Sequence, residues 1–276
     1  MKRREFITFL GGAAGWPLAA RAQQAERMRR IGVLAGLAED DPEMRAQLTA
    51  FARRLQQLGW TDGGNVRIDY RWSAGDADRI RKNVAEVMAL APDVVLAAAA
   101  SVGPLLQASH TVPIVFVLAF DPVGDGFVAS LARPGGNATG FTLFEYGMSG
   151  KWLELLKELA PSTTHAAILR DPATTYGTGQ LGAIQAVAPS FGVELQPIGA
   201  RDGKEIDQLI TSVARASNGG LIVTASPSAA VQRHLIVALA ARYKLPAVYF
   251  QRYFVTAGGL ISYGPDFVDQ IGRAHV

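Results

Sequence analysis

The residues Ile31-Gly-Val-Leu-Ala-Gly36 form a short apolar run that ends in glycine. A run of this length and composition predicts a buried strand of a parallel sheet. The next segment, Met44–Leu58, carries apolar residues at helical spacing and stops at Gly59, so it predicts a helix. A buried parallel strand followed by a helix is the first part of a βαβ unit.

The alternation of strands and helices continues along the chain. Val66–Trp72 alternates polar and apolar residues as an edge strand does, and Pro92 ends the helix that follows it. The predicted elements after the first helix are a strand at Val66–Trp72, a helix at Ala77–Leu90, a strand at Val94–Ala97, a helix at about Ser101–Ala108 and a strand at Ile114–Leu118.

A second series begins at His165 and repeats the order of the first. Its predicted elements are a strand at Ala166–Leu169, a helix at Gly179–Phe191, a strand at Val193–Gln196, a helix at Lys204–Ala216 and a strand at Leu221–Thr224. The turns correspond too, since Gly59 matches Gly192, and Ala74-Gly75-Asp76 matches Arg201-Asp202-Gly203. Short parallel units can resemble one another by chance, but the repeated order favours two similar α/β lobes in one chain.

The first 22 residues have the pattern of an export signal. Lys2-Arg3-Arg4 precedes a short apolar run from Phe6 to about Ala20, and Ala20-Arg21-Ala22 offers a small-x-small cleavage site. The arginine pair resembles a twin-arginine signal, and an ordinary Sec signal is the alternative. We therefore expect cleavage near Ala22 and a periplasmic location. We expect no membrane insertion afterwards, because no later segment has the length of an uncharged membrane span.

Charge and composition exclude several classes of function. The net charge is +3, and residues 1–22 account for all of it with four basic residues and one acidic residue, so nucleic-acid binding is not indicated. The chain has no cysteine, which excludes disulfides, thiolate metal sites and cysteine nucleophiles. Its four histidines show no metal-ligand spacing. We therefore expect no catalytic residues, no metal and no cofactor.

Three long segments resemble one family of ABC transporter substrate-binding proteins. These segments are Asp121–Gly140, Leu239–Tyr249 and Ala257–Gly264, and the likeness extends from Arg30 to about Asp269. The family consists of type I periplasmic-binding-like proteins related to tryptophan and tyrosine uptake systems. The resemblance implies that the chain is not an enzyme and binds a small, amino-acid-like molecule for a membrane permease.

The same resemblance implies a fold and domain boundaries. We expect two Rossmann-like lobes with parallel sheets and a hinge, residues 27–143 plus 253–276 forming the first lobe and 147–251 the second. The last residues, Gly272-Arg-Ala-His-Val276, depart from the resembling proteins, which continue through a further strand and helix. The sequence is therefore expected to be truncated at its C-terminus.

Ligands of open α/β sheets bind beyond the carboxyl ends of the strands, and these ends give the candidate site residues. Ser101 is expected to open a helix, so that its hydroxyl and the adjacent amides hold a carboxylate, or else to act as a plain N-cap. Asp121 is a candidate ammonium acceptor, or else a turn residue. The other candidates are Val102, Thr175, Tyr176 as an aromatic wall, Ser226 and Gln251 as hydrogen-bond partners, and Tyr263 facing either cleft or core.

Two other classes of protein share parts of this pattern. Gly124-Asp125-Gly126 follows a strand, with Glu145 nineteen residues later, which superficially matches a dinucleotide-binding fingerprint in a periplasmic oxidoreductase. Arg133-Pro134 would end the helix of that motif within about two turns, too early for a crossover helix. A ligand-sensing regulator would need a DNA-binding headpiece, but an export signal occupies that position.

Overall fold

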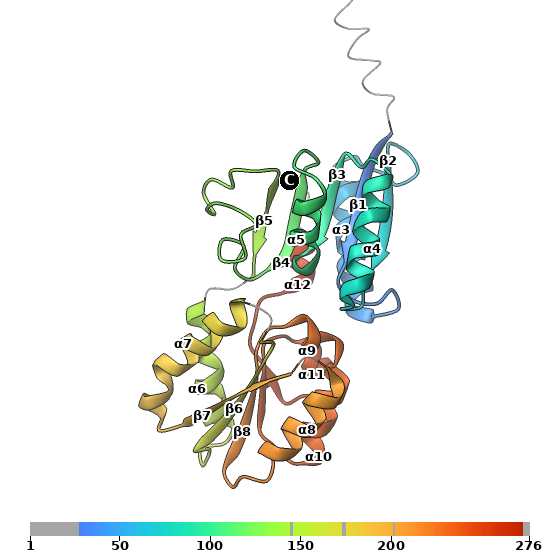
Figure 1. Ribbon diagram of the computed structural model, residues 1–276. Coiled ribbons are helices and arrows are strands. Elements are labelled where there is room, and N and C mark those ends of the chain that lie inside the picture. Colours follow the sequence, from blue (N-terminus) through green and yellow to red (C-terminus); the bar gives the residue numbers. More distant parts are fainter. Residues whose placement is uncertain (1–27, 144–145, 173–174, 201, 273–276) are drawn as a thin grey trace, which may run out of the picture.

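The computed structural model describes residues 28–143, 146–172, 175–200 and 202–272. It shows two α/β lobes, one above the other in Figure 1, each built on a five-stranded parallel sheet. The predicted fold class is confirmed. Among the described residues, none of the helices is both long enough and apolar enough to cross a membrane.

The first lobe follows the predicted alternation closely. Its elements are β1 (Arg29–Ala35), α3 (Pro42–Gln57), β2 (Val66–Trp72), α4 (Ala77–Ala89), β3 (Val94–Ala98), α5 (Ala99–Ala108), β4 (Ile114–Ala119) and β5 (Ala138–Thr142). The strand order is β2-β1-β3-β4-β5, so Val66–Trp72 is the edge strand that its alternating pattern predicts.

The second lobe repeats this arrangement. After η1 (Tyr146–Ser149), its elements are α6 (Gly150–Leu159), β6 (His165–Arg170), α7 (Thr175–Phe191), β7 (Glu194–Gly199), α8 (Gly203–Val213), β8 (Gly219–Val223), α9 (Pro227–Val231), α10 (Arg233–Arg242), β9 (Ala247–Tyr249), α11 (Tyr253–Thr256) and β10 (Ile261–Ser262). The order β7-β6-β8-β9-β10 matches that of the first sheet strand for strand. The internal repeat is therefore a repeat of topology.

The matching turns have matching physical roles. Asp76 caps α4 by accepting the Arg79 N–H at 2.7 Å, and Asp202 caps α8 by accepting the Glu205 N–H at 2.9 Å. Gly59 and Gly192 follow the helices α3 and α7 with φ values of +88° and +60°. Glycine adopts this left-handed conformation without a Cβ penalty, which is why it ends both helices.

The C-terminal residues divide between the lobes, which differs from the expected boundary at residue 253. Ile261 and Ser262 of β10 pair with Val248 and Tyr249 of β9, so residues 253–262 belong to the second lobe. The chain then returns through α12 (Phe267–Gly272), which packs against α3 of the first lobe. The Gln270 amide fixes α12 there, because it accepts the Leu118 N–H at 3.2 Å and donates to Thr142 O at 2.8 Å.

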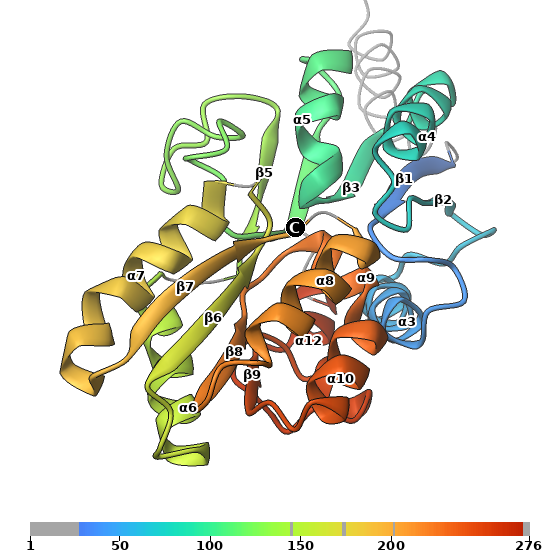
Figure 2. The ribbon, with the colours of Figure 1, turned by 60° about the horizontal axis from the view of Figure 1, so that its bottom comes forward.

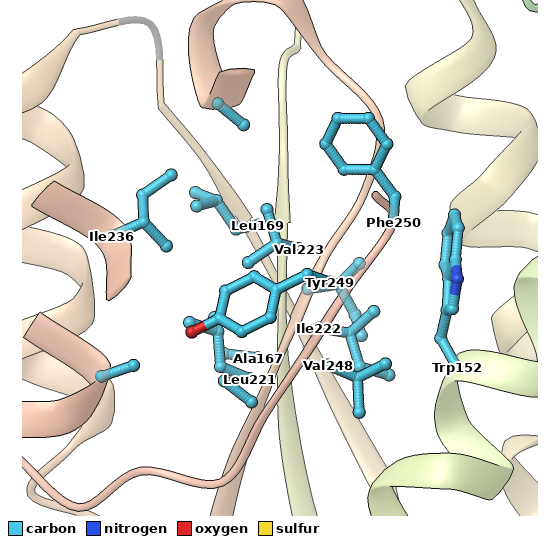
Figure 3. Packing of buried hydrophobic residues seen from close by; sticks show 14 of the residues in the cluster. Trp152, Ala167, Leu169, Leu221, Ile222, Val223, Ile236, Val248, Tyr249 and Phe250 are labelled. Carbon is cyan, nitrogen blue, oxygen red and sulfur yellow. The ribbon is translucent and has the colours of Figure 1, made fainter. Parts of the chain in front are cut away.

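Each lobe has a core on both faces of its sheet. Figure 2 shows α6 and α7 on one side of β6, β7 and β8, with α8 and α10 on the other side. In the close view of Figure 3, Trp152 of α6 covers one face of these strands, and Ile236 and the ring of Tyr249 lie on the opposite face. Trp152 is fully buried, and its indole N–H donates to Tyr263 O at 2.7 Å.

Candidate functional site

A cavity of about 110 Å³ lies between the two lobes, at the carboxyl ends of the strands. The first lobe contributes the residues that follow β1, β2, β3 and β4, and the second lobe contributes those that follow β8 and β9. The lining residues are Gly36, Leu37, Gln47, Ser73, Gly75, Ile80, Ala98, Ala99, Ala100, Leu118, Phe120, Ser226, Pro227, Ala230, Phe250, Tyr253 and Phe267. This is where an open α/β sheet binds its ligand.

Aromatic rings form one wall of the cavity. Phe250 and Tyr253 pack edge to face with ring centroids 5.9 Å apart, and Tyr253 meets Phe267 in the same way at 6.2 Å. Phe120 reaches the cavity from the first lobe. Such rings supply a large apolar surface, with the edge-to-face geometry that their quadrupoles favour. The cavity therefore suits a ligand with an apolar or planar group.

The N-terminus of α5 is a polar feature that the first lobe contributes to the cavity. Ala98, Ala99 and Ala100 line the cavity, and Ala98 is an N-cap whose side chain makes no capping hydrogen bond. The first N–H groups of a helix have no partner within the helix and carry a partial positive charge. This helix end can therefore receive a carboxylate.

The structure corrects the position of Ser101 in this helix. Ser101 was expected to open the helix, but α5 begins two residues earlier, and Ser101 is buried in its first turn. Val102 is fully buried in the core beneath the helix. Neither residue lines the cavity, so the backbone of Ala98–Ala100 takes the place that the sequence indicated for Ser101 and Val102.

Asp121 already has partners within the protein. One carboxylate oxygen accepts the Gly124 N–H at 2.8 Å, as expected if Asp121 is a turn residue. The other accepts the Tyr146 hydroxyl at 2.7 Å. Burial, followed by the contact with Asp121, holds the pKa of Tyr146 well above its ordinary value of 10. Asp121 does not line the cavity, and its contacts join the end of β4 to the start of η1.

The remaining candidates lie in different environments. Ser226 lines the cavity, and its hydroxyl caps α9 by accepting the Ala229 N–H at 3.0 Å. Gln251 is buried and donates to Pro265 O at 2.8 Å, and the Tyr263 side chain is 40% exposed. Thr175 and Tyr176 are the first residues of α7, and their side chains lie outside the described part of the structure.

The dinucleotide-binding alternative is not favoured by the local structure. Gly124-Asp125-Gly126 lies in a series of turns, and no helix follows it before β5 begins at Ala138. A dinucleotide fingerprint needs a helix whose N-terminus holds the pyrophosphate. Glu145, the acidic residue of that alternative, lies outside the described residues.

One cavity residue was missed from the sequence although a signal was present. Met44, Gln47, Phe51 and Leu55 recur at helical spacing and form the buried face of α3. Gln47 is thus a polar residue at a core position of an amphipathic helix, and it is only 1% exposed. Buried polar side chains are uncommon, so this break in the apolar pattern marks a position of interest.

Larger hollows lie outside this interlobe position. One of about 840 Å³ runs between α3 and β2 and is lined by the first lobe alone, including Arg45, Arg53 and Trp60. It is more open and has the larger share of polar surface, whereas the interlobe cavity lies between the two lobes and its surface is almost wholly apolar. Enclosure and apolar walls with few polar groups are the usual properties of small-molecule sites. Within the described ranges, no three His, Asp or Glu residues group as metal ligands would.

Comparisons with known proteins show the family and the fold of this chain. A family model described as ABC transporter substrate binding protein matches residues 30–275. A curated relative, the tyrosine-binding protein of Clostridioides difficile (strain R20291), is 24% identical over 250 residues, which cover 88% of this chain and 69% of that protein.

Two solved structures share the fold. A domain from Streptococcus pneumoniae in complex with L-Trp has a TM-score of 0.81 at 23% identity, covering 90% of this chain and 82% of that chain. A conserved domain protein from Vibrio cholerae has a TM-score of 0.82 at 21% identity, with the same coverage of 90% and 82%. At these identities the likeness concerns the fold.

Proposed function

Because this chain belongs to the ABC transporter substrate binding protein family, we propose that it is the solute-binding component of an importer for an aromatic amino acid. The observation that carries the proposal is the interlobe cavity, with an aromatic wall on one side and the N-terminus of α5 on the other. An aromatic amino acid has an apolar ring and a carboxylate, and the two ends of this cavity complement them.

The relatives support the same class of ligand. One is a tyrosine-binding protein, and a structural neighbour holds L-Trp. The lobes are proposed to close over the ligand and to present it, chemically unchanged, to a membrane permease. Closure buries the ring among Phe120, Phe250 and Tyr253, which is the main source of affinity in such a site.

Direct binding tests this proposal. L-Tryptophan, L-tyrosine and L-phenylalanine are expected to raise the melting temperature of the chain from Gln23 onward, and L-lysine and L-aspartate are not. A ligand at 100 times its Kd stabilises the native state by about 2.7 kcal/mol, a shift that differential scanning fluorimetry resolves. Mass spectrometry after long incubation should recover the amino acid unaltered. Absence of stabilisation by all three aromatic amino acids, or turnover of any of them, contradicts the proposal.

The proposed location rests on residues 1–22, which lie outside the described part of the structure. Paired arginines, a short apolar run and Ala20-Arg21-Ala22 favour export and processing near Ala22. Intact-mass measurement of the protein from a periplasmic fraction is expected to show an N-terminus near Gln23. A chain that keeps Met1 and stays with the cytoplasmic fraction would refute this part of the proposal. Replacing Arg3 and Arg4 by lysines distinguishes the twin-arginine route from the Sec route. The substitution should abolish export by the twin-arginine route and leave export by the Sec route unchanged.

A further inference from the structure

Gln47 is a polar side chain built into the wall of the interlobe cavity. It occupies a core position on α3, between Met44 and Phe51, and it is 1% exposed. It lines the interlobe cavity and also a smaller one of about 40 Å³, and Ala98 and Leu37 line both. Gln47 therefore lies at the same cavity as the N-terminus of α5.

The amide of Gln47 is only half satisfied. Its Nε2 donates to the Glu43 carboxylate at 3.2 Å, one turn earlier on α3. Its Oε1 is buried and accepts no hydrogen bond from any described residue. A carboxylate only accepts hydrogen bonds, so the contact with Glu43 fixes the amino group on that side and leaves the carbonyl oxygen without a donor. A buried acceptor without a donor is costly and indicates a missing partner.

The two polar features of the cavity complement each other. The first N–H groups of α5 are donors, and Ala98 provides no side-chain cap for them. Gln47 Oε1 is an acceptor, and the Glu43 carboxylate lies beside the same amide at the start of α3. A ligand with a carboxylate and an adjacent ammonium group satisfies both, whereas a ligand with a carboxylate alone leaves Gln47 without a donor.

We propose that Gln47 Oε1 accepts a hydrogen bond from the ammonium group of the bound amino acid and selects for that group. The inference rests on the proposed function, and it adds the residue that distinguishes an α-amino acid from the corresponding des-amino acid. Glu43 acts as a positioning residue, because its carboxylate holds the Gln47 amide with the carbonyl directed away from it.

The test compares two ligands that differ only in the amino group, L-tryptophan and 3-indolepropanoate, by calorimetric titration. The variants are Gln47→Met, which keeps the length of the side chain without its acceptor, and Gln56→Met, the same change on the exposed face of α3. Gln47→Met is expected to weaken L-tryptophan binding about tenfold or more, the scale of a hydrogen bond to a charged group. It should change 3-indolepropanoate binding less than about twofold. Gln56→Met should bind both ligands as the parent does.

The outcomes separate this inference from the proposed function. If the parent binds none of the aromatic amino acids, the proposed function fails, and this inference fails with it. If the parent binds L-tryptophan but Gln47→Met leaves the affinity unchanged, or weakens both ligands equally, the inference alone is overturned. The parent provides a check that needs no variant, because equal affinity for L-tryptophan and 3-indolepropanoate would also overturn it.

The melting temperature without ligand gives a second readout. Gln47→Met removes a buried acceptor that has no donor, which favours folding, and also the Nε2 donor to Glu43, which opposes it. The unliganded variant is therefore expected to melt close to the temperature of the parent. A large decrease would indicate a structural role for Gln47 and would count against recognition.

Discussion

Single residues set how closely the elements approach, and Gly140 gives the sharpest case. A Cβ at this position of β5 would lie 2.0 Å from the backbone oxygen of Phe116 in β4. The obstacle is backbone and cannot rotate away, so Gly140→Ala is expected to destabilise the protein by about 1–3 kcal/mol or more in urea unfolding. Gly182→Ala is the matched control, because a Cβ there in the interior of α7 meets nothing within 4 Å. Gly182→Ala should raise the free energy of unfolding by up to about 1 kcal/mol. If it lowers the free energy of unfolding as much as Gly140→Ala does, the packing argument is wrong.

Glu43 gives a pH-dependent prediction at the same scale. Burial is the main reason why its pKa is raised above the ordinary value of 4.5. Folding therefore favours the protonated form, and this contribution to stability is present below about pH 4.5 and is lost as the pH rises through the raised pKa. Glu43→Gln should raise the melting temperature at pH 7 and have little effect at pH 4, while it keeps an acceptor for Gln47. Glu158→Gln, on the exposed surface of α6, is the control, and an equal gain in both variants would show that burial is not the cause.

At the scale of elements, one ion pair joins α3 to α10 across the lobes. Arg233 Nη2 lies 2.6 Å from Asp41 Oδ2, and the two side chains are only 10% and 9% exposed. The guanidinium also lies over the Tyr253 ring, with Cζ 5.7 Å from the ring centroid. Asp41 caps α3 with its other oxygen, accepting the Glu43 N–H at 2.9 Å. The pair therefore couples the cap of one helix to the first residue of another.

Asp41→Asn keeps the cap and removes the charge, so Arg233 would be left buried without its counter-ion in the observed arrangement. Breaking a buried pair in this way costs about 3–5 kcal/mol, and opening of the lobes relieves the cost by returning Arg233 to water. Asp41→Asn is therefore expected to increase the radius of gyration in small-angle X-ray scattering. The control Asp202→Asn changes a cap on α8 within one lobe. If the radius of gyration of Asp41→Asn equals that of the parent, the Asp41–Arg233 ion pair does not hold the two lobes together.

The elements that the sequence predicts correctly are those with a periodic pattern. Helices such as α3 and α4 carry an apolar stripe over three or more turns and end in a glycine or near a proline, so their bounds are close to those expected. The start of α5 was placed late, because its N-cap is Ala98, which carries no capping signature. The two-residue strand β10 has no period at all, and only its pairing with β9 assigns it to the second lobe.

For the whole molecule, the position of the interlobe cavity follows from the strand order that the sequence predicts, whereas part of its lining does not. Parallel strands place their carboxyl ends at one edge, and residues that follow β3, β4, β8 and β9 line the interlobe cavity. The approach of Phe267, which follows the return of the chain to the first lobe, depends on long-range packing that no local pattern encodes. Gln47 interrupts an apolar stripe, and helical periodicity predicts the apolar positions of such a stripe but not the role of a polar residue within it.

The two lobes also differ in how fully their sheets are covered. In the second lobe, buried residues from both faces join one continuous core. In the first lobe the core is divided into two clusters, and hollows of about 840 and 440 Å³ lie beside α3. Less apolar contact around α3 means a lower free energy of local opening there.

Hydrogen exchange measured by mass spectrometry tests this difference. Without ligand, amides of α3 and β2 are expected to exchange faster than those of α10 and β8, because less packing has to be broken to expose them. L-Tryptophan should slow exchange in α3, which contributes Gln47 to the cavity wall, more than in α8, which does not line the cavity. Equal exchange in the two lobes would show that the hollows beside α3 do not weaken the first lobe. Equal protection of α3 and α8 would show that the ligand acts on global stability rather than through the wall that α3 provides.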